Sequence, residues 1–124
     1  MTTKEKFSFK KRVLSFKYAW QGFIALVKTE HNSWIHLFVT ACVIAAGIIW
    51  HVNITEWCLL TICIGSVIGA EAINSAIEAL ADRISLEKDP MLGKAKDLGA
   101  FAVLFVSIAS ICVGLLIFIP RIFF

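Results

Sequence analysis

A stripe of polar side chains follows an uncharged apolar run in the middle of this chain. No charge occurs from Trp57 to Ala70, and the next segment contains three carboxylates and one amide: Glu71, Asn74, Glu78 and Asp82. On a helix these four positions fall within an arc of roughly 80° and extend over roughly 16 Å. Carboxylates within or beside a bilayer are costly and normally face protein or water. The stripe therefore predicts a polar site at one end of a membrane helix, although a solvated helix end with purely structural contacts is the alternative.

The polar and charged residues in and near this stripe include the kinds of side chain that phosphoryl transfer from a nucleotide requires. Divalent cations need oxygen ligands, phosphates need cationic support, and the acceptor hydroxyl needs a base or an orienting group. The relevant residues are Glu30, Glu71, Asn74, Glu78, Asp82, Lys96 and Asp97. Several carboxylates in one confined site repel each other unless a cation lies between them, which favours Mg²⁺. Interhelical Glu–Lys pairing without a metal is the alternative interpretation.

Composition and periodicity indicate the elements that would position these residues. A hydrophobic fraction of 59% and a mean hydropathy of +0.82 are too high for an ordinary soluble fold. We expect one all-α membrane domain over residues 1–124, because the length suits a single domain. Apolar residues at steps of three and four, with lysines between them, predict an amphipathic interfacial helix at about 7–29. Transmembrane helices are predicted at 34–50, 56–82 and 98–119, with Thr55 as the N-cap of the second.

The distribution of basic residues predicts the orientation in the membrane. Seven of the twelve Lys and Arg residues lie at or before Lys28, and four lie between Arg83 and Lys96. None lies between His51 and Glu56. Because basic residues concentrate on the cytoplasmic side, the N-terminus and the loop after Asp82 are expected to be cytoplasmic.

Some residues within the apolar spans are interpreted without a site role. His36 lies one turn inside the first span, where a histidine is more often interfacial or hydrogen-bonded than a ligand. The four cysteines have no metal-ligand spacing and are interpreted as small buried hydrophobic residues.

The sequence also has no P-loop, protein-kinase glycine loop or zinc motif, so any nucleotide chemistry must use an unrelated kind of site.

The polar stripe belongs to a segment that resembles a known family motif. The pattern Glu71-x-Ile73-Asn74-Ser75-Ala76-Ile77-Glu78-x-x-x-Asp82 is similar to that of the prokaryotic diacylglycerol kinase and undecaprenol kinase family. The likeness extends through Lys96-Asp97, Trp20-x-Gly22 and Glu30. The chain departs from the family at Ala81, where Val is usual, and at Asp89, where the family has His. The resemblance implies a small multi-pass lipid kinase of the bacterial inner membrane, which forms homotrimers with sites shared between subunits.

The resemblance also implies a role for each matching residue. Glu71 would be the catalytic base, Glu30 and Glu78 would hold Mg²⁺, and Lys96 would support the transferring phosphate of ATP. Asn74 and Asp97 match further catalytic positions. Nucleotide contacts would come from Asp82, Glu87, Lys96, Asp97 and, in the place of a family arginine, either Lys11 or Arg12.

The acceptor is the point at which the two branches of this family differ. The hypothesis is that the enzyme transfers the γ-phosphate of MgATP to a lipid alcohol. Diacylglycerol, which would give phosphatidic acid, is the first candidate acceptor, and undecaprenol, which would give undecaprenyl phosphate, is the alternative. Arg83-Ile84 is similar to the diacylglycerol branch, whereas Glu30-x-Asn32-x-x-x-His36 and residues 117–121 look more like the undecaprenol branch. A non-enzymatic channel or assembly subunit, with the stripe lining a cation path, remains a remote alternative from another class.

Overall fold

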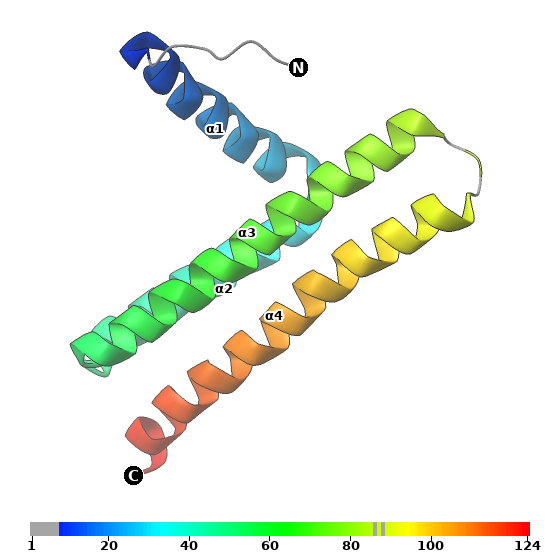
Figure 1. Cartoon of the computed structure of the whole chain (residues 1–124). Coiled ribbons are helices and arrows are strands. Elements are labelled where there is room, and N and C mark those ends of the chain that lie inside the picture. Colours follow the sequence, from blue (N-terminus) through cyan, green and yellow to red (C-terminus); the bar gives the residue numbers. More distant parts are fainter. Residues whose placement is uncertain (1–7, 86, 88) are drawn as a thin grey trace.

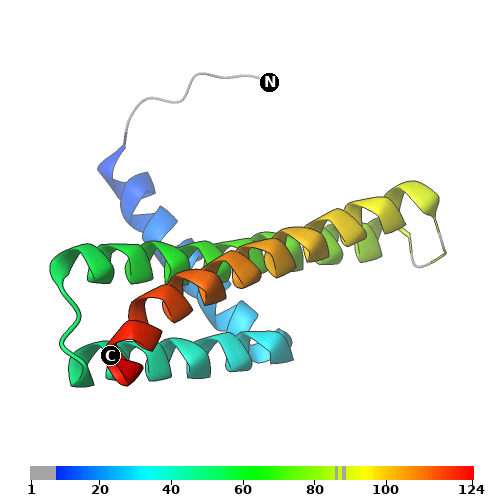
Figure 2. The same ribbon diagram turned by 90° about the horizontal axis from the view of Figure 1, so that it is seen from below.

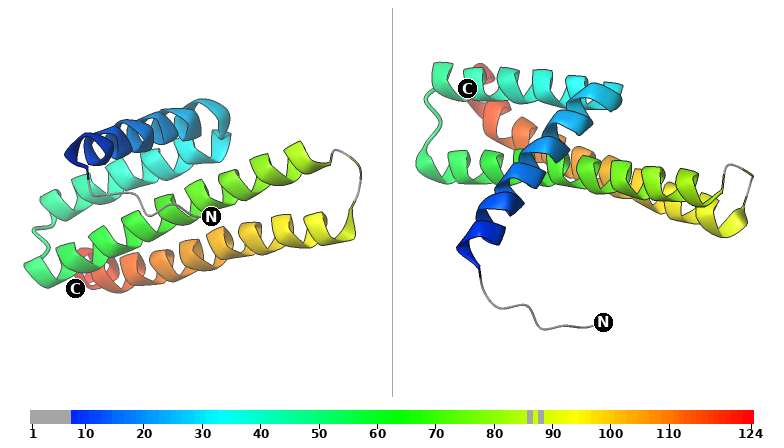
Figure 3. Two further views of the ribbon diagram at one scale, coloured as in Figure 1. Left: turned by 45° about the horizontal axis from the view of Figure 1, so that its top comes forward. Right: turned by 90° about the horizontal axis from the view of Figure 1, so that it is seen from above.

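The structure, a computed structural model, describes residues 8–85, 87 and 89–124, and the regular secondary structure of that part of the chain is all α-helix. Its helices are α1 (Phe9–Thr29), α2 (His31–Ile49), α3 (Ile54–Ile84) and α4 (Pro90–Phe123). The predicted all-α fold is confirmed, although position 7 of the predicted first helix lies outside the described residues. Figure 1 shows α3 and α4 as a long antiparallel pair, with α2 alongside the first half of α3. Seen from above in the right view of Figure 3, α1 runs across α3.

Within the described residues, α2, α3 and α4 are each long and apolar enough to cross a membrane. Their lengths are 19, 31 and 34 residues, whereas about 20 residues are enough for one crossing. The helix α4 also begins well before the predicted span at residue 98. The extra length of α3 and α4 lies at the end where the loop after α3 leads into α4. We call this end of the pair the hairpin end (residues 71–99). Counted from Ile54, Glu71 lies within the roughly 20 residues needed for one crossing, whereas Asn74, Glu78 and Asp82 lie beyond that length.

The opposite end of the pair, which we call the turn end (residues 50–56 with Arg121), is organised by a helix cap. The side chain of Asn53 accepts a hydrogen bond from the backbone N–H of Glu56 at 2.8 Å, and the Glu56 carboxylate accepts one from the N–H of Asn53 at 3.0 Å. This reciprocal capping box satisfies two otherwise unpaired donors. The prediction that Thr55 is the N-cap is therefore wrong, since the helix already begins at Ile54.

The corner between α1 and α2 is fixed by side chains that bond the last carbonyls of α1. The Ser33 hydroxyl donates to the carbonyl oxygens of Glu30 at 2.6 Å and Leu26 at 3.2 Å. The Trp34 indole donates to the carbonyl of Val27 at 2.8 Å. The Leu26 carbonyl also accepts from the backbone N–H of Glu30 at 3.0 Å, so the side chains add to the backbone bonds that end α1. The corner residue Glu30 has an extended backbone and is thereby held beside α3.

The chain buries few of its apolar side chains against itself. Its buried hydrophobic residues are Leu26, Val52, Leu60, Ala81 and Ile117, whereas large side chains along α4 such as Phe101 and Leu116 are more than half exposed. Such apolar faces need lipid or another protein surface to cover them. The cysteines are free, as predicted, but the prediction of burial is wrong: Cys63 is half-buried and the other three are exposed. A thiol is apolar enough to lie on such faces.

Candidate active site

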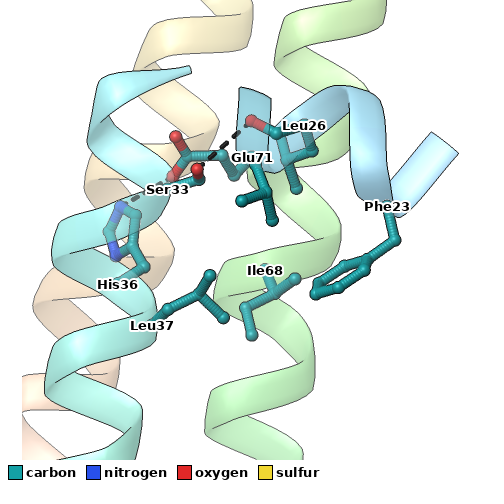
Figure 4. A pocket seen from close by; sticks show the side chains of 8 residues that line it. Phe23, Leu26, Ser33, His36, Leu37, Ile68 and Glu71 are labelled. Carbon is teal, nitrogen blue, oxygen red and sulfur yellow. Dashed lines mark hydrogen bonds and ion pairs between the residues drawn. The ribbon is translucent and has the colours of Figure 1, made fainter. Parts of the chain in front are cut away.

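Glu71 begins the polar stripe and is buried although it can carry a charge. It is 5% exposed. Its Oε2 lies 2.7 Å from Nε2 of His36, which projects from α2 (Figure 4). The two groups are close enough for an ion pair but are not aligned as a hydrogen bond, so Oε2 has no hydrogen-bond partner among the described residues. Buried polar atoms of this kind are uncommon in folded proteins and often mark sites that a ligand or a substrate completes.

Two further carboxylates lie close enough to Glu71 for their charges to act on it. They are Glu30, at the corner between α1 and α2, and Glu78, two turns later on α3. Like charges gathered in this way destabilise each other unless a cation or a proton is present. The fold thus brings together three carboxylates that the sequence placed in two separate segments.

Asn74 lies between the two α3 carboxylates and is positioned by the neighbouring helix. Its Nδ2 donates to Oε1 of Glu78 at 3.4 Å, while its Oδ1 is buried and has no hydrogen-bond partner in the described residues. Gly99 of α4 lies against that oxygen, and a Cβ atom at this position would collide with it. The absence of a side chain at Gly99 is therefore what lets Asn74 lie between α3 and α4.

Lys96 of α4 connects the far end of the stripe to the second helix of the pair. Its Nζ lies 2.9 Å from Oδ1 of Asp82, and Glu78 also acts on it through its charge. Both side chains of the Lys96–Asp82 pair are accessible, at 41% and 55% exposed. The ammonium group is therefore held at a fixed place and remains open to a second anionic partner.

An open pocket of about 390 Å³ lies beside this ion pair, at the hairpin end. Its lining includes Asp82, Ser85, Glu87, Asp89 and Lys96. The Ser85 hydroxyl accepts a hydrogen bond from the N–H of Glu87 at 3.1 Å, which fixes the first turn of the loop. The volume is within the usual range for sites that bind small molecules.

A second, much smaller cavity lies on the other side of Glu71. Figure 4 shows it between α1, α2 and α3, with apolar side chains forming most of its wall: Phe23, Leu26, Val27, Leu37 and Ile68. The polar lining residues are Ser33, His36 and Glu71. Glu71 thus lines the apolar cavity, and Asp82, the last residue of the same stripe, lines the open pocket.

Not every predicted site residue joins this group within a single chain. Lys11 and Arg12 lie near the start of α1, which Figures 1 and 2 show well away from the loop between α3 and α4. Asp97 follows Lys96 on α4 and is exposed. Conversely, His36 contacts Glu71 although it was not predicted as a site residue. The available signal was an ionisable residue inside an apolar span, a position that is functional by default in membrane proteins.

Comparison with known proteins agrees with the chemistry of this site. The family model described as prokaryotic diacylglycerol kinase matches residues 17–118. The chain belongs to the prokaryotic diacylglycerol kinase family. The undecaprenol kinase of Bacillus subtilis (strain 168) is 34% identical over 107 residues, which is 86% of this chain and 87% of that protein. The diacylglycerol kinase of Pseudomonas aeruginosa is 34% identical over 105 residues (83% and 84%), and that of Synechocystis is 33% identical over 109 residues (87% and 62%).

Membership of this family confirms the resemblance and assigns the general activity. The chain is an ATP-dependent lipid kinase. Together with three helices that could each span a bilayer, this makes it an integral membrane protein. A lipid kinase acts on a water-soluble nucleotide and on a lipid, and in this structure Glu71 lines the small apolar cavity while the open pocket adjoins Asp82 at the other end of the stripe.

Proposed function

We propose that this kinase transfers the γ-phosphate of ATP to the hydroxyl group of a membrane lipid alcohol, with Glu71 as the general base. The position of Glu71 carries this proposal: it is buried, faces an apolar cavity, and begins a polar stripe that ends at an open pocket. A lipid alcohol stays within the leaflet and presents its hydroxyl at the interface. ATP comes from water, so the two substrates would meet at this residue.

The remaining stripe residues would support the nucleotide. Lys96 would stabilise negative charge on the transferring phosphate, because its ammonium group is fixed by Asp82 and remains accessible. Asn74 and Asp97 would complete the catalytic group, and Asp82 and Glu87 would contact ATP from the walls of the open pocket. Either Lys11 or Arg12 would contact the nucleotide phosphates.

Glu30 and Glu78 would hold the Mg²⁺ that accompanies ATP. In the described part of the chain, no three side chains of His, Cys, Asp or Glu are arranged to hold a metal ion. Two carboxylates nevertheless suit Mg²⁺, which is commonly bound by one or two carboxylates together with substrate phosphates. The negative charges of Glu30 and Glu78, which both act on Glu71, fit a bound cation. When bound, the ion would neutralise charge that develops on the phosphate oxygens.

For the acceptor we place undecaprenol first and diacylglycerol second. The undecaprenol kinase of Bacillus subtilis matches 86% of this chain over 87% of its own length, which supports this order. The sequence hypothesis had the opposite order. The names of the Pseudomonas and Synechocystis relatives keep diacylglycerol as the second candidate.

We also propose in which membrane the kinase lies, how it is oriented there and how its subunits assemble. The N-terminus and the hairpin end would face the cytoplasm of a bacterial inner membrane, because both are rich in lysine and arginine. The α1 helix would lie at the inner interface. A homotrimer with shared sites would cover part of the exposed apolar faces, and it would bring Lys11 or Arg12 of one subunit to the open pocket of another.

Purified protein in lipid bilayers, supplied with ATP and Mg²⁺, tests the function directly. Undecaprenol and diacylglycerol should be offered separately and then in competition, and the products separated as polyprenyl phosphate and phosphatidic acid. We expect kcat/KM to be higher for undecaprenol. A preference for diacylglycerol would reverse the order of acceptors, and a lack of phosphorylated lipid with either substrate would contradict the proposed function.

A further inference from the structure

We propose that His36 is a positioning residue, which holds the carboxylate of Glu71 in the orientation needed to take the proton of the acceptor hydroxyl. The inference rests on the proposed function of Glu71 as the base. It concerns a contact between two helices that the sequence hypothesis did not include. The imidazole of His36 belongs to α2 and the carboxylate belongs to α3, so only the packing of these helices brings them together.

The contact has the geometry of an anchor for one oxygen of the carboxylate. Nε2 of His36 lies 2.7 Å from Oε2 of Glu71, and the side chains are 23% and 6% exposed. Figure 4 shows that oxygen directed at the imidazole and the other carboxylate oxygen directed away from it. A small rotation of either side chain would align the pair as a hydrogen bond. One oxygen would then be held while the other could accept a proton from a substrate.

The charges around Glu71 favour such an anchor. Glu30 and Glu78 both act on this carboxylate through their negative charges, whereas the imidazole of His36 acts on it with the opposite effect. A glutamate side chain has several rotatable bonds, so repulsion alone would turn it away from these neighbours. Among the described residues, His36 is the group that the structure places in direct polar contact with Glu71. Its contact opposes that rotation from the α2 side.

The chemical step that this arrangement serves is a balanced phosphoryl transfer. The acceptor oxygen forms a bond to the γ-phosphorus as the bond from that phosphorus to the bridging oxygen of ATP breaks, and ADP leaves with the electron pair. The hydroxyl proton passes to the free oxygen of Glu71 and leaves to water in a later step. His36 touches neither substrate in this scheme. A base displaced by about 1 Å can lower the rate by roughly 10²-fold, which is the effect expected when the anchor is lost.

Paired substitutions at His36 test the inference. His36→Leu removes the polar contact at similar volume, whereas His36→Gln keeps an N–H donor near the position of Nε2. We expect His36→Leu to lower kcat by about 10²-fold with an unchanged KM for ATP and an unchanged Tm, and we expect His36→Gln to restore kcat to within about fivefold of wild type. His31→Leu is the matched control on the same helix, because His31 is exposed and should tolerate the change.

Three results would overturn the inference: wild-type kcat in His36→Leu, a glutamine variant as inactive as the leucine variant, or losses of activity that follow losses of Tm. If His36→Leu does not assemble, His36→Asn replaces it, because its shorter amide remains polar but should not reach Glu71. A double variant with Glu71→Gln should show no further loss from the change at His36.

The outcomes also separate this inference from the proposed function. A wild-type protein that phosphorylates no lipid alcohol contradicts both. A Glu71→Gln variant with normal turnover also contradicts both, because no base then remains to be positioned. An inactive Glu71→Gln variant together with a fully active His36→Leu variant contradicts the positioning role alone.

Discussion

The two ends of the α3–α4 pair carry similar residue types but use them differently. At the turn end, Glu56 and Asn53 bond each other reciprocally, and the guanidinium of Arg121 bonds Glu56 and the carbonyl oxygen of Trp50. At the hairpin end, by contrast, Oε2 of Glu71 and Oδ1 of Asn74 are buried with no hydrogen-bond partner among the described residues. Both ends thus contain a glutamate within α3 and a basic residue on α4.

This difference distinguishes polar groups that stabilise the fold by bonding each other from polar groups that are available to bind a ligand. A buried polar atom without a partner costs about 1–3 kcal/mol, so a fold tolerates it mainly where something else will satisfy it. At the turn end, the pair of Glu56 and Arg121 joins the start of α3 to the C-terminal turn of α4. At the hairpin end, Oε2 of Glu71 lies beside His36 and Oδ1 of Asn74 lies against Gly99, and neither oxygen accepts a hydrogen bond among the described residues. The comparison predicts that substitutions at one end change stability and those at the other change catalysis.

The largest effect is expected from the glutamates of the two ends. Glu71→Gln should lower kcat by about 10²–10⁴-fold, the usual loss when a general base is removed, with little change in the affinity for ATP or in Tm. Glu56→Gln is the matched control: it should lower Tm and leave kcat within about twofold, because it weakens the contact with Arg121. Steady-state kinetics and thermal unfolding measure both. Near-normal turnover in Glu71→Gln would end the base assignment and make Asp97 the next candidate.

The next effect concerns the metal. Glu78→Gln removes one negative charge without changing volume, so it should weaken Mg²⁺ dependence and ATP affinity. Loss of groups that only support metal ligands lowers metal affinity by about 10–100-fold, so a direct ligand should lower it by at least about 10-fold. A titration of activity with Mg²⁺ at fixed ATP measures this shift. An unchanged titration with unchanged ATP affinity would assign Glu78 a structural role.

A smaller effect is expected where α4 makes room for the site. Gly99→Ala should displace Asn74, because the new methyl group would collide with Oδ1 of that residue. We expect kcat to fall by about 10-fold, less than for a displacement of the base itself. Gly114→Ala on the same helix is the control, since nothing lies within 4 Å of a Cβ atom there. Equal kinetics in the two variants would show that the position of Asn74 does not matter for turnover.

The last prediction concerns orientation and should leave activity unchanged. In a background with the four native cysteines replaced, Thr55→Cys should be labelled from outside intact cells by a membrane-impermeant maleimide, whereas Lys94→Cys should be labelled only after the membrane is opened. Both positions are exposed in the structure. The reverse pattern would place the hairpin end outside, away from cytoplasmic ATP.

Much of the site could be predicted because a helix fixes the spacing of its own residues. The stripe from Glu71 to Asp82 is visible in the sequence since positions three and four apart share one helix face. The start of α3 was less predictable. Thr55 is a good capping residue in isolation, but Asn53 forms the cap because Glu56 lies three residues after it and completes the capping box.

The sequence by itself determined the helices, the apolar lengths that could cross a bilayer, the polar stripe and the kinase family, because each depends on local periodicity or on a continuous motif. Only the tertiary structure decided which residues from different helices meet. It placed His36 of α2 against Glu71, brought Glu30 to the same carboxylate, set Gly99 beside Asn74, and paired Lys96 with Asp82. The physical reason is that helical periodicity determines which residues share a face, whereas the contacts between faces depend on how the helices pack together.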